Sequence, residues 1–169
     1  GGMTTFVIGG LTGVMVAMAP FDFQAHDTFF VVGHLHYVLI GGSVFPILAG
    51  IYYYAPIVKG IKLSDKLGKI CFWLIFIGFN ITFFPMHVTG LKGMTRRIFT
   101  YPEEMGVSEL NFISSVGAFI LGVGVLVLLI DLLRPKGKRP FSERNPWNAG
   151  TLEWTMKIPD RQWGIRSIP

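Results

Sequence analysis

The sequence predicts an all-α integral membrane protein with four transmembrane helices and an extended, polar C-terminal tail. Only 15% of the 169 residues are charged and 51% are hydrophobic, whereas a soluble domain usually carries about 25% charged residues. The mean hydropathy is +0.52. The apolar residues gather into four long stretches, and helices that are apolar on every side are typical of membrane spans.

The expected spans cover residues 3–20, 29–58, 70–86 and 110–130. The first has no charge but is slightly short for the ~20 residues that a span needs. Because the chain begins Gly-Gly rather than Met, we expect this stretch to be cut at its start. In the second span, Pro46 is expected to bend the helix. The fourth span is expected to end at Asp131, so that residues 1–134 form the membrane portion.

Loop charges predict the orientation of these spans. The loop at residues 59–69 carries four lysines, and the tail at residues 135–169 begins with further basic residues. Both are therefore expected on the cytoplasmic or matrix side of a bacterial plasma membrane or a mitochondrial inner membrane. The loop after the third span lies on the other side, yet it carries Arg96 and Arg97. We expect this pair to have a local anionic partner, because guanidinium groups form charge-assisted hydrogen bonds with carboxylates.

Charge and cysteine content exclude several classes of function. The net charge is +5, but the basic residues lie between apolar runs and form no basic groove with stacking aromatics. No nucleic-acid partner is therefore expected. Cys71 is the only cysteine, so the chain can form neither an internal disulfide nor a zinc or iron–sulfur site based on cysteines.

Two histidines, His34 and His36, lie within the second span. Ionisable residues in a span are costly and usually functional. Successive helical residues are rotated by about 100°, so that residues i and i+2 point about 200° apart. The two histidines could therefore bind separate centres on opposite sides of the helix, but hardly one metal together. Alternatively, each donates a hydrogen bond to a neighbouring helix.

His26 and Asp27 stand just before this span. With a ligand from another chain, they could bind a hard or borderline cation. They could equally form a helix cap and a solvated loop. His87, at the end of the third span, has no assignment from the sequence alone.

The segment from His26 to Leu39, HDTFFVVGHLHYVL, closely resembles the metal-binding helix of subunit I of the heme-copper terminal oxidases. Further blocks agree in order: GGLTG at 9–13, FFPMH at 83–87, GLKGMTRR at 90–97, NPWNA at 145–149 and TLEW at 151–154. The resemblance covers essentially the whole chain. It points to the cytochrome c oxidase branch, with the quinol oxidases as close neighbours.

The resemblance implies a role for each histidine of the second span. His34 would be the axial ligand of the high-spin heme, and thus the catalytic residue of this chain. His36 would be one axial ligand of the low-spin heme. Leu35 stands where the family commonly has Phe, which removes an aromatic bridge between the hemes and leaves both ligands.

The resemblance also implies roles outside this helix. His26 and Asp27 would bind magnesium together with a ligand from subunit II. Arg96 and Arg97 would pair with heme propionates, and Asp22 would lie near the same groups.

The implied activity is reduction of oxygen to water with electrons from cytochrome c, coupled to proton pumping. The cofactors would be two hemes of the A type, copper with its ligands outside this chain, and magnesium. Subunit I of the family is a bundle of roughly twelve helices, so these four spans would be its C-terminal part, from a split gene or a truncated sequence. The partners would be the N-terminal part of subunit I, subunits II and III, membrane lipid, and cytochrome c or quinol as donor. The alternatives are a quinol oxidase, an electron-transfer cytochrome, or a membrane scaffold without catalysis.

Overall fold

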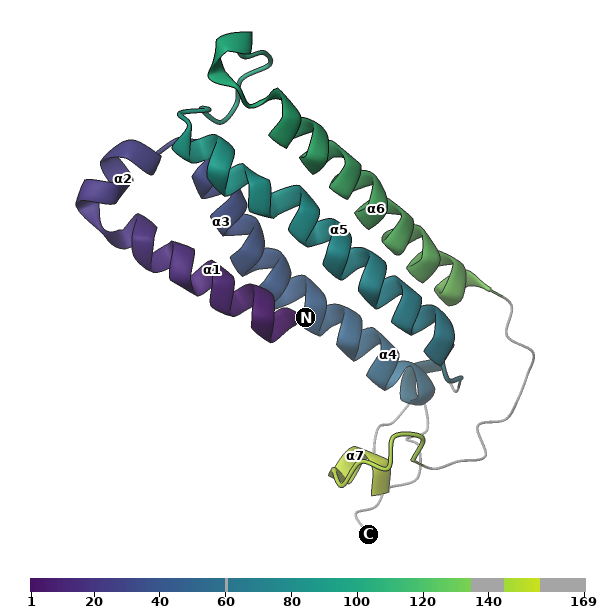
Figure 1. Ribbon diagram of the computed structural model, residues 1–169. Coiled ribbons are helices and arrows are strands. Elements are labelled where there is room, and N and C mark those ends of the chain that lie inside the picture. Colours follow the sequence, from purple (N-terminus) through teal and green to yellow (C-terminus); the bar gives the residue numbers. More distant parts are fainter. Residues whose placement is uncertain (60, 135–144, 156–169) are drawn as a thin grey trace.

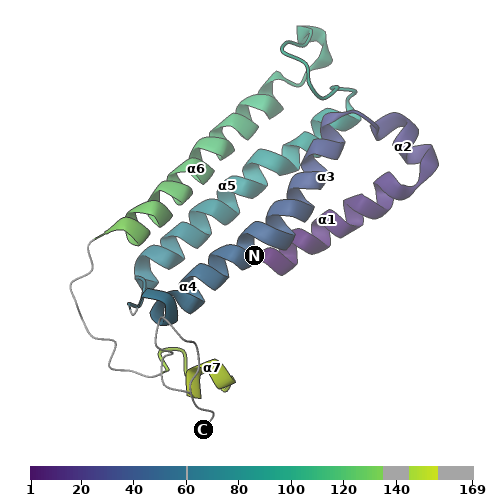
Figure 2. The same ribbon diagram turned by 180° about the vertical axis from the view of Figure 1, so that it is seen from behind.

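The computed structural model describes residues 1–59, 61–134 and 145–155, and the regular elements within these ranges are helices. In chain order they are α1 (Gly2–Ala17), α2 (Ala19–Ala25), α3 (Phe29–Leu39), η1 (Ile40–Val44), α4 (Phe45–Lys59), α5 (Asp65–Leu91), η2 (Glu103–Met105), α6 (Ser108–Leu133) and α7 (Leu152–Thr155). The long helices lie side by side in the spatial order α1, α3 with α4, α5 and α6 (Figure 1, Figure 2). The prediction of an all-helical fold is thus confirmed for the described residues.

The first predicted span is interrupted. Helix α1 ends at Ala17, Met18 is extended, and α2 continues at 100° to α1. Pro20 explains the break, because it has no N–H to donate to the carbonyl of Val16 and is favoured in the first turn of a new helix. Among the described residues, three helices are long and apolar enough to cross a membrane, and α1 with α2 makes a fourth only if the bent pair is one span.

The second span runs as one helix through residues 29–58. It changes at η1 to a π turn, in which the Phe45 amide donates to the Ile40 carbonyl. Pro46, at which we expected the helix to bend, comes directly after this turn. The helix is irregular here, as a π turn, but it is not bent by more than 40°. The turn also brings Gly41 against Thr5 of α1, since a Cβ at Gly41 would lie 2.5 Å from the Thr5 hydroxyl oxygen.

The third and fourth spans are longer than predicted, because tertiary contacts stabilise their polar ends. Helix α5 begins at Asp65, one residue after Ser64, whose side chain accepts a hydrogen bond from the Leu67 amide. Helix α6 continues through Asp131 instead of ending there. Asp131 is fully buried, and its Oδ2 accepts hydrogen bonds from the Tyr52 hydroxyl (3.3 Å) and the Ser64 amide (3.1 Å).

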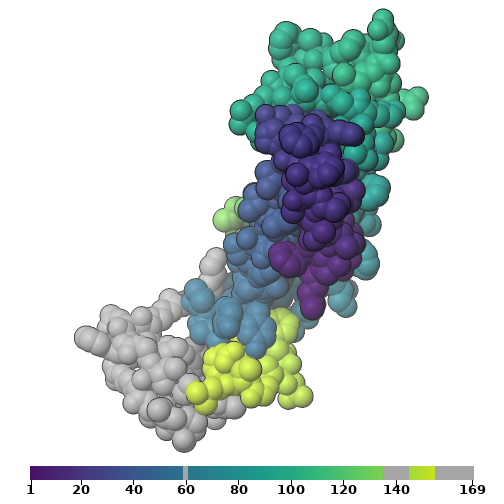
Figure 3. All heavy atoms as spheres, turned by 90° about the vertical axis from the view of Figure 1, so that its left-hand side faces the viewer, coloured from purple at the N-terminus to yellow at the C-terminus, as the bar shows by residue number. Residues whose placement is uncertain are grey.

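Part of the predicted tail lies against the end of α4. The Trp147 indole donates to the Tyr53 carbonyl (3.1 Å), and Trp154 packs edge-on against the Tyr53 ring. Figure 3 shows residues 145–155 in yellow beneath the end of α4, at the opposite end of the molecule from α2. Residues 135–144 and 156–169 of the predicted tail lie outside the described residues.

Candidate functional site

His34 points from α3 toward α1. Its Nδ1 lies 3.0 Å from the Gly9 carbonyl oxygen and 3.1 Å from the Thr12 hydroxyl oxygen. A Cβ at Gly13 would lie 2.9 Å from Cε1 of this imidazole, so only a glycine leaves the ring its present place. Helix α1 therefore forms a cradle of backbone and small residues for His34.

His36 points from the same helix toward α5. Its Nδ1 lies 2.7 Å from the Val32 carbonyl oxygen, one turn earlier in α3. The ring stacks on Phe83 of α5, with 4.1 Å between the ring centroids and an interplanar angle of 14°. The two histidines thus face different neighbouring helices. Only His34 makes a hydrogen bond to a neighbouring helix, since that of His36 stays within α3.

Both imidazoles fit the requirements of an iron ligand. A carbonyl oxygen can only accept, so Nδ1 donates in each ring and Nε2 keeps its lone pair. Within the described part of the chain, neither Nε2 has a hydrogen-bond partner. Metal-binding histidines usually donate their second ring nitrogen to a carbonyl or carboxylate, which fixes the tautomer and the direction of the ligating nitrogen. Two separate axial ligands are compatible with this geometry.

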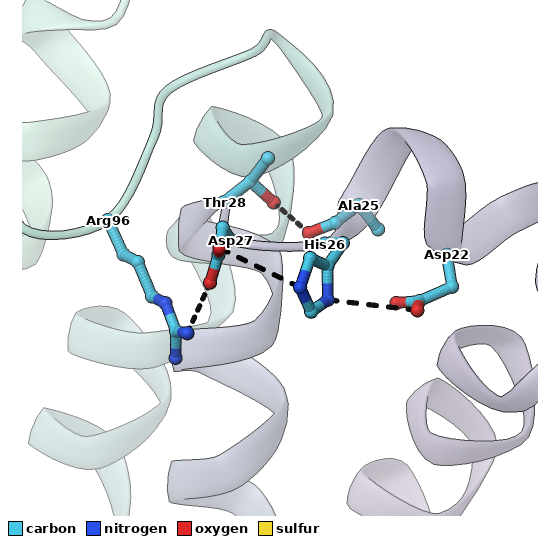
Figure 4. A network of polar contacts seen from close by, with 6 residues as sticks. All are labelled: Asp22, Ala25, His26, Asp27, Thr28 and Arg96. Atoms are coloured by element: carbon cyan, nitrogen blue, oxygen red, sulfur yellow. Dashed lines mark hydrogen bonds and ion pairs between the residues drawn. The ribbon is translucent and has the colours of Figure 1, made fainter.

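His26 lies between two carboxylates where α2 gives way to α3 (Figure 4). Its ring nitrogens are each 3.7 Å from a carboxylate oxygen, one of Asp22 and one of Asp27. The Thr28 hydroxyl stabilises this turn by donating to the Ala25 carbonyl (2.6 Å). The His26 side chain is 67% exposed.

No group of three or more His, Cys, Asp or Glu side chains in the described residues is arranged to hold a metal ion. The predicted magnesium ligands His26 and Asp27 would therefore need further ligands from another chain. Asp22, one of the two carboxylates beside His26, lies on α2, and its Oδ1 is buried without a hydrogen-bond partner in the described part of the chain.

The loop after α5 is attached to the start of α3. The Arg96 guanidinium forms an ion pair with the Asp27 carboxylate (Figure 4), and the Arg96 amide donates to the Asp27 carbonyl (2.8 Å). The amide of Phe29 donates to the carbonyl of Met94 (2.9 Å). Asp27 is thus one anionic partner of the predicted arginine pair. Arg97 is exposed, has a positive φ of 64°, and has no ion pair among the described residues.

His87, which the sequence left unassigned, lies between α3 and α5. It is only 7% exposed, and its ring stands edge-on to Phe30. A Cβ at Gly33 would lie 2.9 Å from its Cε1. The imidazole therefore contacts the residue before His34. Spacing shows only that Phe83 and His87 share one helix face, and the sequence does not show that this face meets α3.

Comparison with known proteins gives consistent matches. The family model described as cytochrome c and quinol oxidase polypeptide I matches residues 1–120. Cytochrome c oxidase subunit 1 of Alkalihalophilus pseudofirmus is 45% identical over 167 residues, which are 98% of this chain and 27% of the relative. The Synechocystis protein of the same name is 47% identical over 159 residues, 94% of this chain and 28% of the relative. Quinol oxidase subunit 1 of Bacillus subtilis is 50% identical over 152 residues, 88% of this chain and 23% of the relative. The chain thus spans about a quarter of the length of these relatives.

Proposed function

Because the chain belongs to the cytochrome c and quinol oxidase polypeptide I family, we propose that it forms the C-terminal part of the catalytic subunit I of a heme-copper terminal oxidase. The assembly includes the N-terminal part of subunit I and subunits II and III. It reduces oxygen to water with electrons from cytochrome c and pumps protons. Since the matched relatives described above are bacterial, the proposed location is a bacterial plasma membrane.

The observation that carries this proposal is the arrangement of the two histidines of α3. Their Nδ1 atoms donate to carbonyl oxygens, and their Nε2 atoms are open on different sides of the helix. His34 would hold the high-spin heme and His36 the low-spin heme, both of the A type. When bound, the hemes, with copper held outside this chain, supply electron transfer and oxygen reduction. This chain binds and orients: α1 fixes the direction of His34, and α3 with α5 fixes that of His36.

Arg96 and Arg97, in the loop after α5, would neutralise the heme propionates. Asp27 engages only part of the Arg96 guanidinium, which has five N–H donors. The other terminal N–H donors of Arg96 and the exposed Arg97 would be available for carboxylates, and Asp22 would lie nearby. His26 and Asp27 would bind magnesium with a ligand from subunit II.

Optical spectra of the purified complex test the ligand assignment. His34→Ala should abolish the high-spin heme signal and leave much of the low-spin band, and His36→Ala should do the reverse. Leu39→Ala is the matched control, because it truncates an exposed apolar side chain of the same helix outside the position between the two histidines. If both hemes persist unchanged in both histidine variants, the assignment is wrong.

A quinol oxidase is the second candidate, since the Bacillus subtilis quinol oxidase subunit 1 is 50% identical to this chain. Oxygen consumption with reduced cytochrome c, compared with that with a quinol, distinguishes the two donors. An electron-transfer cytochrome would contain two six-coordinate hemes and would not bind carbon monoxide when reduced. A complex without a pyridine hemochrome spectrum would identify a scaffold instead.

A further inference from the structure

The stack between Phe83 and His36 restricts the imidazole in a specific way. The two rings are nearly parallel, at 14°, with centroids 4.1 Å apart. The hydrogen bond from Nδ1 to the Val32 carbonyl fixes which ring nitrogen points back along α3. Rotation of the imidazole about its Cβ–Cγ bond would break this hydrogen bond and drive the ring into Phe83. The open Nε2 of His36 therefore has one preferred direction, and the ring has one preferred plane.

The Phe83 ring also packs against other aromatic rings of the interior. Its ring lies 5.0 Å from that of Phe79, which is completely buried. Phe79 in turn stands edge-on to Tyr37 (4.8 Å) and to Phe45 (6.2 Å). Since well-packed interiors resist displacement, Phe83 cannot retreat from His36 without moving buried aromatic rings.

The backbones on either side of the stack are also held in register. One turn of α5 before Phe83, Asn80 accepts a hydrogen bond from the Tyr37 hydroxyl (2.8 Å). One turn after it, His87 contacts α3 so closely at Gly33 that a Cβ there would lie 2.9 Å from the imidazole. Residues three and four apart occupy one face of a helix, so these three side chains of α5 form a continuous contact with α3.

We propose that Phe83 is a positioning residue that sets the plane of the His36 imidazole. This inference rests on the proposed function, in which His36 is an axial ligand of the low-spin heme. Groups that contact a metal ligand orient it and tune the metal. The plane of an axial imidazole affects the electronic splitting of a low-spin ferric heme, which electron paramagnetic resonance reports as g values. Phe83 therefore acts on the heme through His36, without touching the iron.

The test uses the full complex with Phe83→Leu, which removes the ring. Electron paramagnetic resonance of the oxidised low-spin heme and its absorption band are measured, with heme content from the pyridine hemochrome. We expect shifted g values and a shifted band with both hemes retained. Phe83→Tyr should restore the wild-type spectra because it keeps the stacked ring. Phe84→Leu is the matched control, since this neighbouring ring is 57% exposed and does not stack on His36.

Wild-type g values and band in Phe83→Leu would overturn the inference. Equal shifts in Phe83→Leu and Phe84→Leu would overturn it as well, because they would indicate general loosening of α5. If Phe83→Leu does not assemble, Phe83→Met removes the ring but keeps an unbranched, flexible apolar side chain that can fill the space, and it is judged by the same criteria. Retention of the low-spin heme in His36→Ala would refute the proposed function instead, whatever spectrum the Phe83 variants give.

Discussion

Replacing Gly117 with alanine should force α5 and α6 apart where their backbones meet. A Cβ at Gly117 would lie 2.6 Å from the amide nitrogen of Thr82 and 2.8 Å from the carbonyl carbon of Ile81. On the facing helix, a Cβ at Gly78 would lie 2.5 Å from the amide nitrogen of Leu121. These three obstructing atoms belong to the backbone, so rotation of a side chain, including that of Ile81, cannot relieve the overlap.

The size of the effect follows from this geometry. Restoring ordinary van der Waals contact for the Gly117 methyl requires the helices to separate by roughly 0.8 Å, and such a gap forfeits a quarter to a half of the dispersion energy of each contact. Extra methyl groups in packed interiors cost about 1–3 kcal/mol. Gly122 provides a matched control on the same helix, because no atom of another described helix or loop lies within 4 Å of its Cβ position. Alanine should there be neutral or stabilising by up to about 1 kcal/mol.

Thermal unfolding of the purified assembly in detergent, followed by circular dichroism, measures the difference. Gly117→Ala should lower the midpoint, whereas Gly122→Ala should leave it unchanged or raise it. A double variant with Gly78→Ala should lose less stability than the sum of the single variants, because one separation of the helices relieves both overlaps. If Gly117→Ala is as stable as Gly122→Ala, the close crossing of α5 and α6 does not exist in the assembly.

Three further changes test other contacts. Tyr37→Phe removes the donor to the side-chain oxygen of Asn80 and should lower the free energy of unfolding by about 1–3 kcal/mol; an unchanged midpoint would contradict the buried hydrogen bond. Asp131→Ala removes the acceptor of the Ser64 amide and should accelerate hydrogen exchange at the start of α5, while exchange in the middle of α5 stays slow. Trp147→Ala removes the indole hydrogen bond to the end of α4 and should accelerate proteolysis within residues 145–155; cleavage at the wild-type rate would show that this contact does not hold the segment.

The spans were predictable because hydropathy is a local property, but their ends were not. Asp131 was expected to end the fourth span because a carboxylate in an apolar environment is costly. Its hydrogen bonds with Tyr52 and Ser64 come from segments far away in the sequence, so α6 can continue past it. In the first stretch the cause is local instead, because Pro20 interrupts the helix that we expected to run through residues 3–20.

In the candidate site, too, local features were predictable from the sequence, whereas contacts between distant segments were not. Helical spacing predicted that the rings of His34 and His36 diverge, because that follows from rotation per residue alone. The ion pair between Asp27 and Arg96 depends instead on how the loop after α5 attaches to the start of α3. No local pattern connects two residues so far apart in the chain. The role of Phe83 was hidden for a similar reason, since the sequence does not say which face of α5 meets α3.

The two histidines are fixed by different kinds of contact, although only one residue separates them. The His34 ring depends on α1, through the Gly9 carbonyl and the space above Gly13. The His36 ring depends on its own helix and on Phe83 of α5. A change between α1 and α3 therefore acts first on one ring, and a change between α3 and α5 acts first on the other. Because α3 is a continuous helix, it keeps the spacing of the two imidazoles constant while different contacts orient each ring separately.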